Sequence, residues 1–112
     1  MKKLYIITII ILLSLYTSTS YAKYNANMKG IPTKVAVYTD GDYIYFTLNN
    51  QPTSHPKCRS NYFVIPSSVP QNRREMLLSR LLTAYAMKEK VNIGYDNSVE
   101  CADGYIKVHR VG

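Results

Sequence analysis

The sequence predicts a mainly β domain with one helix, in the order strand-strand-strand-helix-strand-strand that is typical of the OB-fold barrel. Only one segment after residue 22 has a sustained helical period, and it lies within residues 70–96. Short strand-like segments precede and follow this segment. A ferredoxin-like order would need a helix after the first strand, which the pattern lacks, and an irregular α+β sandwich is the alternative.

Residues 1–22 are predicted to be a secretory signal peptide, and residues 23–112 the folded domain. Lys2 and Lys3 supply a positive start, an apolar run follows, and the small side chain of Ala22 ends a cleavage-site pattern. The apolar run is shorter than the about 20 residues of a membrane span, which disfavours an uncleaved anchor. We therefore expect a location in the periplasm or outside the cell, with no transmembrane segment after cleavage.

Three strands are expected before the helix. The first covers residues 34–39, after a polar arm at residues 23–30, and Asp40-Gly41 then favours a two-residue hairpin turn. The second covers residues 42–48. The third, residues 61–66, follows a long loop rich in turn-forming residues. The apolar residues with inward-facing spacing in the first two strands are Val35, Val37, Ile44, Phe46 and Leu48.

The helix is predicted to begin at Asn72, a residue that can cap it, with Glu75 at the spacing of a capping box. At about 100° per residue the side chains divide between two arcs. The arc expected to face the core contains Leu77, Leu78, Leu81, Leu82 and Tyr85. The second arc contains Met76, Ser79, Arg80, Thr83 and Met87. Its composition leaves two interpretations open, a solvated face or a contact surface for another subunit.

Two strands are expected after the helix. The fourth strand covers residues 90–96, with Val91 and Ile93 inward. A turn at residues 97–104 leads to the fifth strand, residues 105–111. The inward residues of the fifth strand are Ile106 and Val108.

Tyrosines are spread over the predicted strands, mostly on the side opposite the aliphatic residues. A tyrosine offers a flat apolar ring with a polar tip, which suits both sugar faces and protein interfaces. The simpler interpretation is that tyrosine favours half-exposed strands. The residues concerned are Tyr38, Tyr43, Tyr45, Tyr62, Tyr95 and Tyr105.

Cys58 and Cys101 are the two cysteines of the chain. An even pair in an oxidising compartment predicts one disulfide. The alternative is a catalytic thiol with His55 as its base, which the second cysteine disfavours. Two cysteines and two histidines without ligand-like spacing predict no metal site, and we expect no cofactor.

The formal net charge is +7 for the whole chain and +5 after removal of Lys2 and Lys3. A basic domain often binds nucleic acid, but export argues against that role, including that of a single-strand-binding OB domain. The charge fits an acidic partner outside the cytoplasm, or solubility alone. No acid–base pair of carboxylates, phosphate loop or nucleophile elbow is present in the sequence, so we expect no enzymatic activity.

The sequence resembles the B subunits of subtilase cytotoxin and typhoid toxin. The resemblance follows the chain: the signal peptide, the segment from Ile31 into KVAVYTDG, the return DYIYFTL, a loop ending in Cys58, and LLTAYA leading into VNIGYD and the Cys101 turn. It implies an OB barrel assembled as a homopentamer, with the second helix arc around a central pore. It also implies binding of sialylated host cell-surface glycans and a toxin A subunit as partner.

The resemblance implies a glycan site at Thr33 and Tyr95. Thr33 matches a hydroxyl residue just before the family's first strand, and Tyr95 matches a tyrosine ending the strand after the helix. Lys34 lies beside Thr33 and would favour an acidic sugar. Threonine stands where the family typically has serine, and residues 46–48 lack the cysteine of the subtilase type. Fold and assembly are therefore expected to carry over more readily than sugar specificity.

Two hypotheses from different classes result. The first is a secreted, non-catalytic, glycan-binding toxin B subunit that attaches to host cells and delivers an A subunit. The second is a small periplasmic protein-interaction module or inhibitor with an OB-like barrel.

Overall fold

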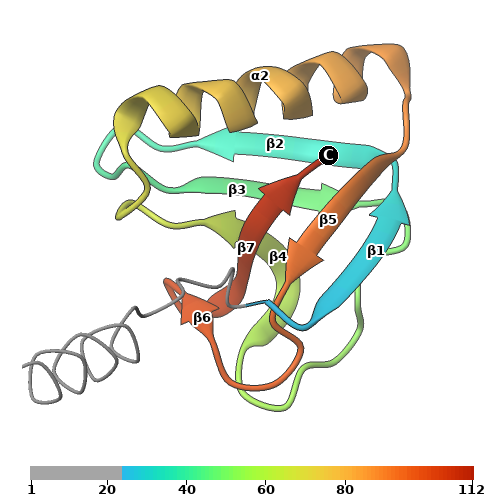
Figure 1. The fold of residues 1–112 in the computed structure, drawn as a ribbon, viewed down its shortest axis with the longest axis vertical. Helices are drawn as coiled ribbons and strands as arrows, with labels where there is room; N and C mark the ends of the chain where they lie inside the picture. Colours follow the sequence, from blue (N-terminus) through green and yellow to red (C-terminus); the bar gives the residue numbers. More distant parts are fainter. Residues whose placement is uncertain (1–23) are drawn as a thin grey trace, which may run out of the picture.

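A computed structural model describes residues 24–112, and the predicted signal peptide lies outside the described residues. Strands dominate the described chain, and the one helix in it lies between the fourth and fifth strands (Figure 1). The elements are β1 (Ala26–Gly30), β2 (Pro32–Val37), β3 (Ile44–Leu48), β4 (Arg59–Ile65), α2 (Gln71–Met87), β5 (Val91–Tyr95), β6 (Cys101–Ala102) and β7 (Tyr105–Val111).

The strands form one curved sheet in the order β1-β5-β7-β4-β3-β2, and β6 pairs with β7. β4 and β7 run parallel, whereas the other neighbours are antiparallel. The two ends of this path, β1 and β2, follow one another in the chain and are separated only by Ile31. Taken as halves of one bent strand, they give the predicted order of five long strands with a helix after the third. The mainly β, OB-like fold class is thus confirmed. The sheet is open, and its two end strands are consecutive in the chain.

The expected polar arm before the first strand is wrong for residues 26–30, which form β1. This strand pairs with β5 from Ala26 opposite Tyr95 to Gly30 opposite Val91. Its side chains alternate between half-buried and exposed, and Met28 packs against the core. Because Met28 is the one large apolar residue among the inward positions of β1, which otherwise carry alanine and glycine, the period of two was too weak to stand out as a strand.

The two Asp-Gly dipeptides adopt different structures. Asp40-Gly41 does not form the expected two-residue hairpin, because the β2–β3 register ends at Val37 opposite Ile44 and leaves six residues between them. Asp103 and Gly104, in contrast, connect β6 to β7 directly, with φ of 51° and 81°. Positive φ at both central residues is the requirement of a type I′ turn, and an Asp-Gly pair meets it at little cost.

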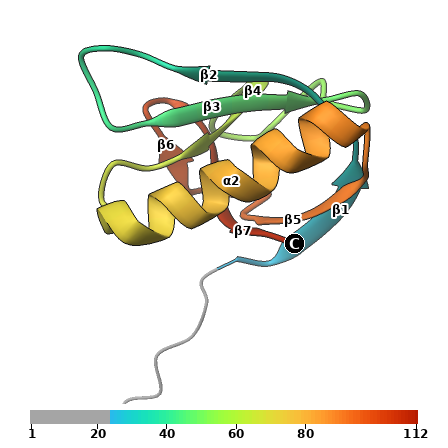
Figure 2. The ribbon, with the colours of Figure 1, turned by 90° about the horizontal axis from the view of Figure 1, so that it is seen from above.

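The core lies between the inner side of the sheet and α2, which crosses above the strands (Figure 2). The inward residues predicted for the second, fourth and fifth strands are buried, whereas Val35 is half-buried and Val37 is exposed. Phe46 and Phe63 stack at the centre, with ring centroids 5.5 Å apart. The buried residues of these strands include Ile44, Phe46, Leu48, Val91, Ile93, Ile106 and Val108.

The start and the rotation of α2 differ from the prediction. Pro70 occupies the cap position, no side chain caps the helix, and Asn72 lies inside the first turn. Leu81 and Ala84 are the helix residues that are fully buried, whereas Leu82 and Tyr85 are about half exposed. Ala84 lets the helix approach the sheet closely on its own side, which turns Leu82 and Tyr85 toward the surface. The predicted inner arc is therefore correct for Leu77, Leu78 and Leu81 and wrong for these two residues.

A disulfide joins Cys58 to Cys101, with their Cα atoms 5.6 Å apart, which confirms the predicted pairing. His55 organises the turn before Cys58 and does not act on a free thiol. Its Nδ1 accepts hydrogen bonds from the backbone N–H groups of Lys57 and Cys58, at 3.1 and 2.9 Å. Its Nε2 lies 2.9 Å from the carbonyl oxygen of Asp96, so the neutral tautomer with a proton on Nε2 satisfies all three contacts.

Asp96 holds the turn between β5 and β6. Its carboxylate accepts hydrogen bonds from the backbone N–H groups of Val99 and Glu100 and from Ser98. Burial opposes ionisation, but the bonds from Glu100, Val99 and Ser98 outweigh it and lower the pKa of Asp96 to about 2. Because the folded pKa is depressed, the carboxylate stabilises the fold above its ordinary pKa of 3.8, and this contribution disappears as the pH falls through about 2.

Candidate functional site

Five tyrosines gather on the outer side of the sheet, and we call this surface the tyrosine face. Tyr45 of β3 is at its centre, with ring centroids 5.1 to 6.2 Å from four other tyrosine rings. Several pairs meet edge to face, which is a favourable geometry for aromatic rings. The tyrosine face consists of Tyr38, Tyr43, Tyr45, Tyr62 and Tyr105, from the β2–β3 connection, β3, β4 and β7.

Val64 supports this face from below. It is fully buried yet does not belong to the main core cluster. It pairs with Tyr45 on one side and Lys107 on the other, so the alternation of β4 places it on the outer side of the sheet. Val64 is thus an apolar residue that is covered on the tyrosine side of the sheet, outside the main core.

Charged groups border the tyrosine face. The Nζ atom of Lys34 donates a hydrogen bond of 2.7 Å to the Tyr62 hydroxyl and lies 5.1 Å from the centre of that ring. The guanidinium of Arg59 lies 4.1 Å from the centre of the Tyr105 ring. The Tyr45 hydroxyl donates a hydrogen bond to Asp103. One carboxylate and two cations therefore surround a mainly aromatic surface.

These contacts define the protonation states. The hydrogen bond to Asp103, together with partial burial, raises the pKa of Tyr45 to about 12. The hydrogen bond to Tyr62 raises the pKa of Lys34 above its ordinary value. Near neutral pH the face therefore offers a protonated tyrosine hydroxyl and a charged ammonium group.

A shallow hollow of about 210 Å³ lies at one end of the tyrosine face. Tyr38 and Tyr43 line it, with Tyr45 and Asp103 among the other lining residues. Tyr38 is 55% exposed, so part of its ring is available for contact. The hollow combines aromatic walls with the carboxylates of Asp40 and Asp103, an arrangement that fits a small polar molecule with an apolar face.

The three ligand residues predicted from the sequence lie at different places. Lys34 belongs to the tyrosine face. The Thr33 hydroxyl is hydrogen-bonded to Thr47 at 2.8 Å, and Thr33 lines a separate hollow with Tyr85 and Lys88. Tyr95 is half-buried at the end of β5, and its ring packs against Phe63 with centroids 5.4 Å apart.

Thr33 and Tyr95 are far apart along the bent first strand. Tyr95 is opposite Ala26, at the far end of β1, whereas Thr33 lies beyond the bend in β2. Seven residue steps separate Ala26 from Thr33, which corresponds to at most roughly 23 Å of extended chain. Within one chain, the structure therefore brings Lys34, and not Thr33 or Tyr95, into the tyrosine face.

Sequence reasoning missed Arg59 and Asp103 as members of this site. The signal that could have found them is the disulfide, because it fixes residue 58 beside residue 101. Arg59 then pairs with Tyr105 across the β4–β7 ladder, and the tight turn places Asp103 beside the Tyr45 hydroxyl.

The second arc of α2 is exposed, apart from the partly shielded Arg80. Met76 is 71% and Met87 67% exposed, unusually high for large apolar side chains without a partner. Ser79 and Thr83 are also exposed, and Arg80 forms an ion pair of 3.4 Å with Glu89. Among residues 24–112, four of the seven large, exposed hydrophobic residues lie on this helix: Met76, Leu82, Tyr85 and Met87.

The remaining polar clusters form structural contacts. On the outer side of β7, the Oε2 atom of Glu100 lies 3.6 Å from the Nζ atom of Lys107 and 2.9 Å from the Nε2 atom of His109. Within residues 24–112, no group of three metal-ligating side chains comes together. The same part of the chain contains no helix long and apolar enough to cross a membrane.

Comparisons of the chain with protein-family models, with curated proteins and with solved structures give no match.

Proposed function

We propose that this protein is a secreted, non-catalytic subunit that binds glycans, with sialylated cell-surface glycans as its ligands, through the tyrosine face. The observation that carries this proposal is the set of five tyrosine rings assembled around Tyr45 and bordered by Lys34, Arg59 and Asp103. The toxin-type role, delivery of an A subunit to host cells, is the larger proposal within which this binding activity fits.

Sugars suit this surface because they have both apolar and polar faces. A pyranose ring can lay its C–H groups on an exposed tyrosine, while its hydroxyls exchange hydrogen bonds with phenol and carboxylate groups. Asp103 accepts such bonds, and the neutral phenols both donate and accept them. The rings also pack edge to face on one another, so less side-chain entropy is lost on binding.

Two cations at the border of the face would attract an acidic sugar. Lys34 and Arg59 supply these charges, while the carboxylates of Asp40 and Asp103 line the hollow itself. Opposite charge attracts the carboxylate of a sialic acid, although at an exposed site the gain is modest. The cations therefore contribute more to the specificity for acidic over neutral glycans than to the strength of binding.

The exposed arc of α2 supports assembly into a ring. Monomeric proteins rarely leave several large apolar side chains exposed on one element, and a second copy of the chain would cover them. We propose a homopentamer with the five α2 helices around the axis, as the sequence resemblance implies. Five weak sites on one ring would raise the apparent affinity for a glycan-dense surface by about 10² to 10⁴.

The glycan proposal is tested with sialylated oligosaccharides and their desialylated counterparts on an array and by calorimetry. Tyr38→Ala should weaken binding of the sialylated ligand at least about fivefold, because its ring is exposed at the hollow. Lys34→Gln should weaken sialylated ligands while leaving neutral ones nearly unchanged.

Tyr85→Ala is the matched control in calorimetry, which reports the affinity of each site and not the multivalent gain of a ring, because Tyr85 is similarly exposed but lies on α2. Tyr85 lines the hollow that contains Thr33, so the control also separates the two candidate sites. A loss with Tyr85→Ala and none with Tyr38→Ala would move the glycan site to Thr33. If the wild-type protein binds no glycan, the proposal of glycan binding is refuted.

The ring is tested by light scattering on the mature protein at tens of micromolar. We expect the mass of five copies, and Met76→Glu with Met87→Glu should shift it toward the monomer because charge repels within a closed apolar contact. A wild-type monomer would refute the ring and favour the second candidate, a periplasmic protein-interaction module. The exposed α2 side chains favour that candidate as well, since another protein could cover them.

A further inference from the structure

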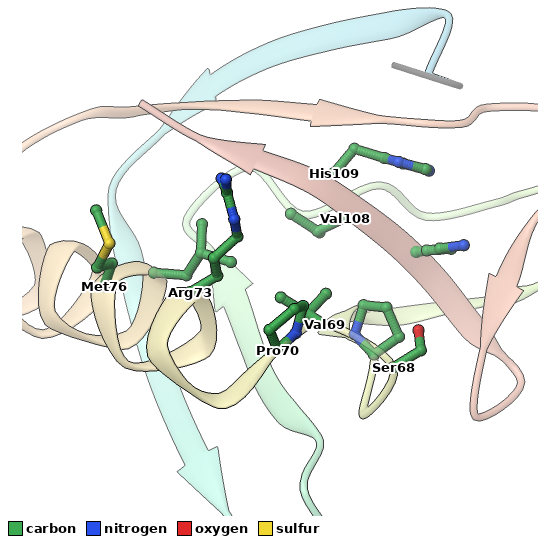
Figure 3. Close-up of a pocket in the computed structure, with 10 residues that line it drawn as sticks. Ser68, Val69, Pro70, Arg73, Met76, Val108 and His109 are labelled. Atoms are coloured by element: carbon green, nitrogen blue, oxygen red, sulfur yellow. The ribbon is translucent and has the colours of Figure 1, made fainter. Parts of the chain in front are cut away.

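A second concave site lies on the other side of β7, between this strand and the first turns of α2 (Figure 3). Its volume is about 480 Å³, within the range of small-molecule sites. The turn from β4 into α2 forms one wall, through Ser68, Val69 and Pro70. Figure 3 shows Val108 directed into the space between strand and helix, and Arg73 extending from α2 toward β7.

The interior of this cleft is apolar. Leu77 and Val69 are partly buried and pack against the core, and Val108 is buried. A ligand that enters would leave water and contact these aliphatic groups, which favours a compact hydrocarbon or aromatic body.

The rim of the cleft is cationic. Arg73, Lys107 and His109 are its ionisable lining residues, and no carboxylate lines it. Lys107 and His109 already share Glu100. Arg73 has no ion pair or side-chain hydrogen bond within residues 24–112, so its guanidinium is available to an incoming anion. Lys107 is therefore paired with a carboxylate outside the cleft, and the unpaired cation at the rim is Arg73.

We propose that this cleft binds a small organic carboxylate, with the charged group at Arg73 and its apolar body on Val69, Leu77 and Val108. Arginine presents parallel N–H donors that match a carboxylate in two-point contact. The Ser68 hydroxyl at the rim can donate one further hydrogen bond. This site is separate from the tyrosine face and does not depend on glycan binding.

The test titrates 3-phenylpropionate, and separately its uncharged amide of equal size, into the full mature protein. Binding is measured from the nuclear magnetic resonance spectrum of the protein. The carboxylate should bind in the millimolar range expected of a fragment and shift the amide signals of residues 66–73 and 107–109. The amide should bind at least about fivefold more weakly, because it lacks the charge.

Arg73→Gln should lower the affinity for the carboxylate by about five- to tenfold and leave the amide unaffected. Arg59→Gln is the matched control, since it removes the same charge from the tyrosine face. Met76 also lines the cleft but belongs to the exposed arc of α2, so it is left unchanged.

Equal affinity for the two probes would overturn the proposal, since binding would then depend on apolar contact alone. Equal weakening of carboxylate binding by Arg73→Gln and Arg59→Gln would also overturn it, since net charge and not the cleft would then explain the affinity. Failure here leaves the glycan result untouched, because the glycan variants change residues of the tyrosine face and of α2 away from this cleft.

Discussion

Removal of the Cys58–Cys101 disulfide is expected to lower the melting temperature by roughly 15–30 °C. The bond joins residues 43 positions apart, and closing a loop of this length stabilises a fold by about 4 kcal/mol in the chain-entropy treatment. In a domain of this size, each kcal/mol corresponds to roughly 4–8 °C. The bond also connects β6 to the start of β4, where Arg59 begins its pairing with Tyr105.

The measurement is a thermal melt of Cys58→Ala/Cys101→Ala, a double variant that leaves no unpaired thiol. Wild type unfolded with a reducing agent present is the control, and it should show a similar loss. A change below about 5 °C in both samples would contradict the prediction. A loss in the double variant alone would assign the effect to the alanine side chains, since Cys58 is buried.

Leu81→Ala is expected to destabilise the protein by about 2–5 kcal/mol, and Leu82→Ala by less than about 1 kcal/mol. Leu81 is fully buried where α2 meets the sheet, whereas Leu82 is 47% exposed. Both substitutions replace leucine by alanine in the middle of the same helix, so helix propensity changes equally. The difference between them therefore reports burial alone.

Urea unfolding at low protein concentration gives the two free energies. Low concentration matters because an assembled ring would bury part of Leu82. Equal losses for the two variants at low concentration would show that α2 is rotated relative to the described position, with Leu82 in the core as the amphipathic pattern suggested.

The apolar period of the sequence predicts the position of α2 but not its rotation relative to the sheet. The apolar period correctly places a helix within residues 70–96 and correctly chooses Leu77, Leu78 and Leu81 as core residues. It assigned Leu82 and Tyr85 to the core because a periodicity argument weighs large apolar residues and overlooks alanine. Packing favours Ala84 instead, because its small side chain permits close approach of helix and sheet.

The site shows the same limit. The tyrosines and Lys34 could be picked out as surface residues by their alternation along the strands. Which of them meet depends on register and on strand order, since Tyr45, Tyr62 and Tyr105 come from three neighbouring strands that the chain does not connect in sequence. Arg59 and Asp103 joined the face only through the disulfide and the tight turn beside it.

Local sequence patterns are sufficient to predict the mainly β class, the single helix in residues 24–112, the paired cysteines and the inward residues of the second, fourth and fifth strands. These features depend on local periodicity and on composition, which are readable along the chain. The tertiary structure decided that residues 26–30 form a strand, that Asp103-Gly104 and not Asp40-Gly41 makes the tight turn, and that Thr33 and Tyr95 lie apart. Each of these depends on contacts between segments distant in sequence, and their energies carry no local signature.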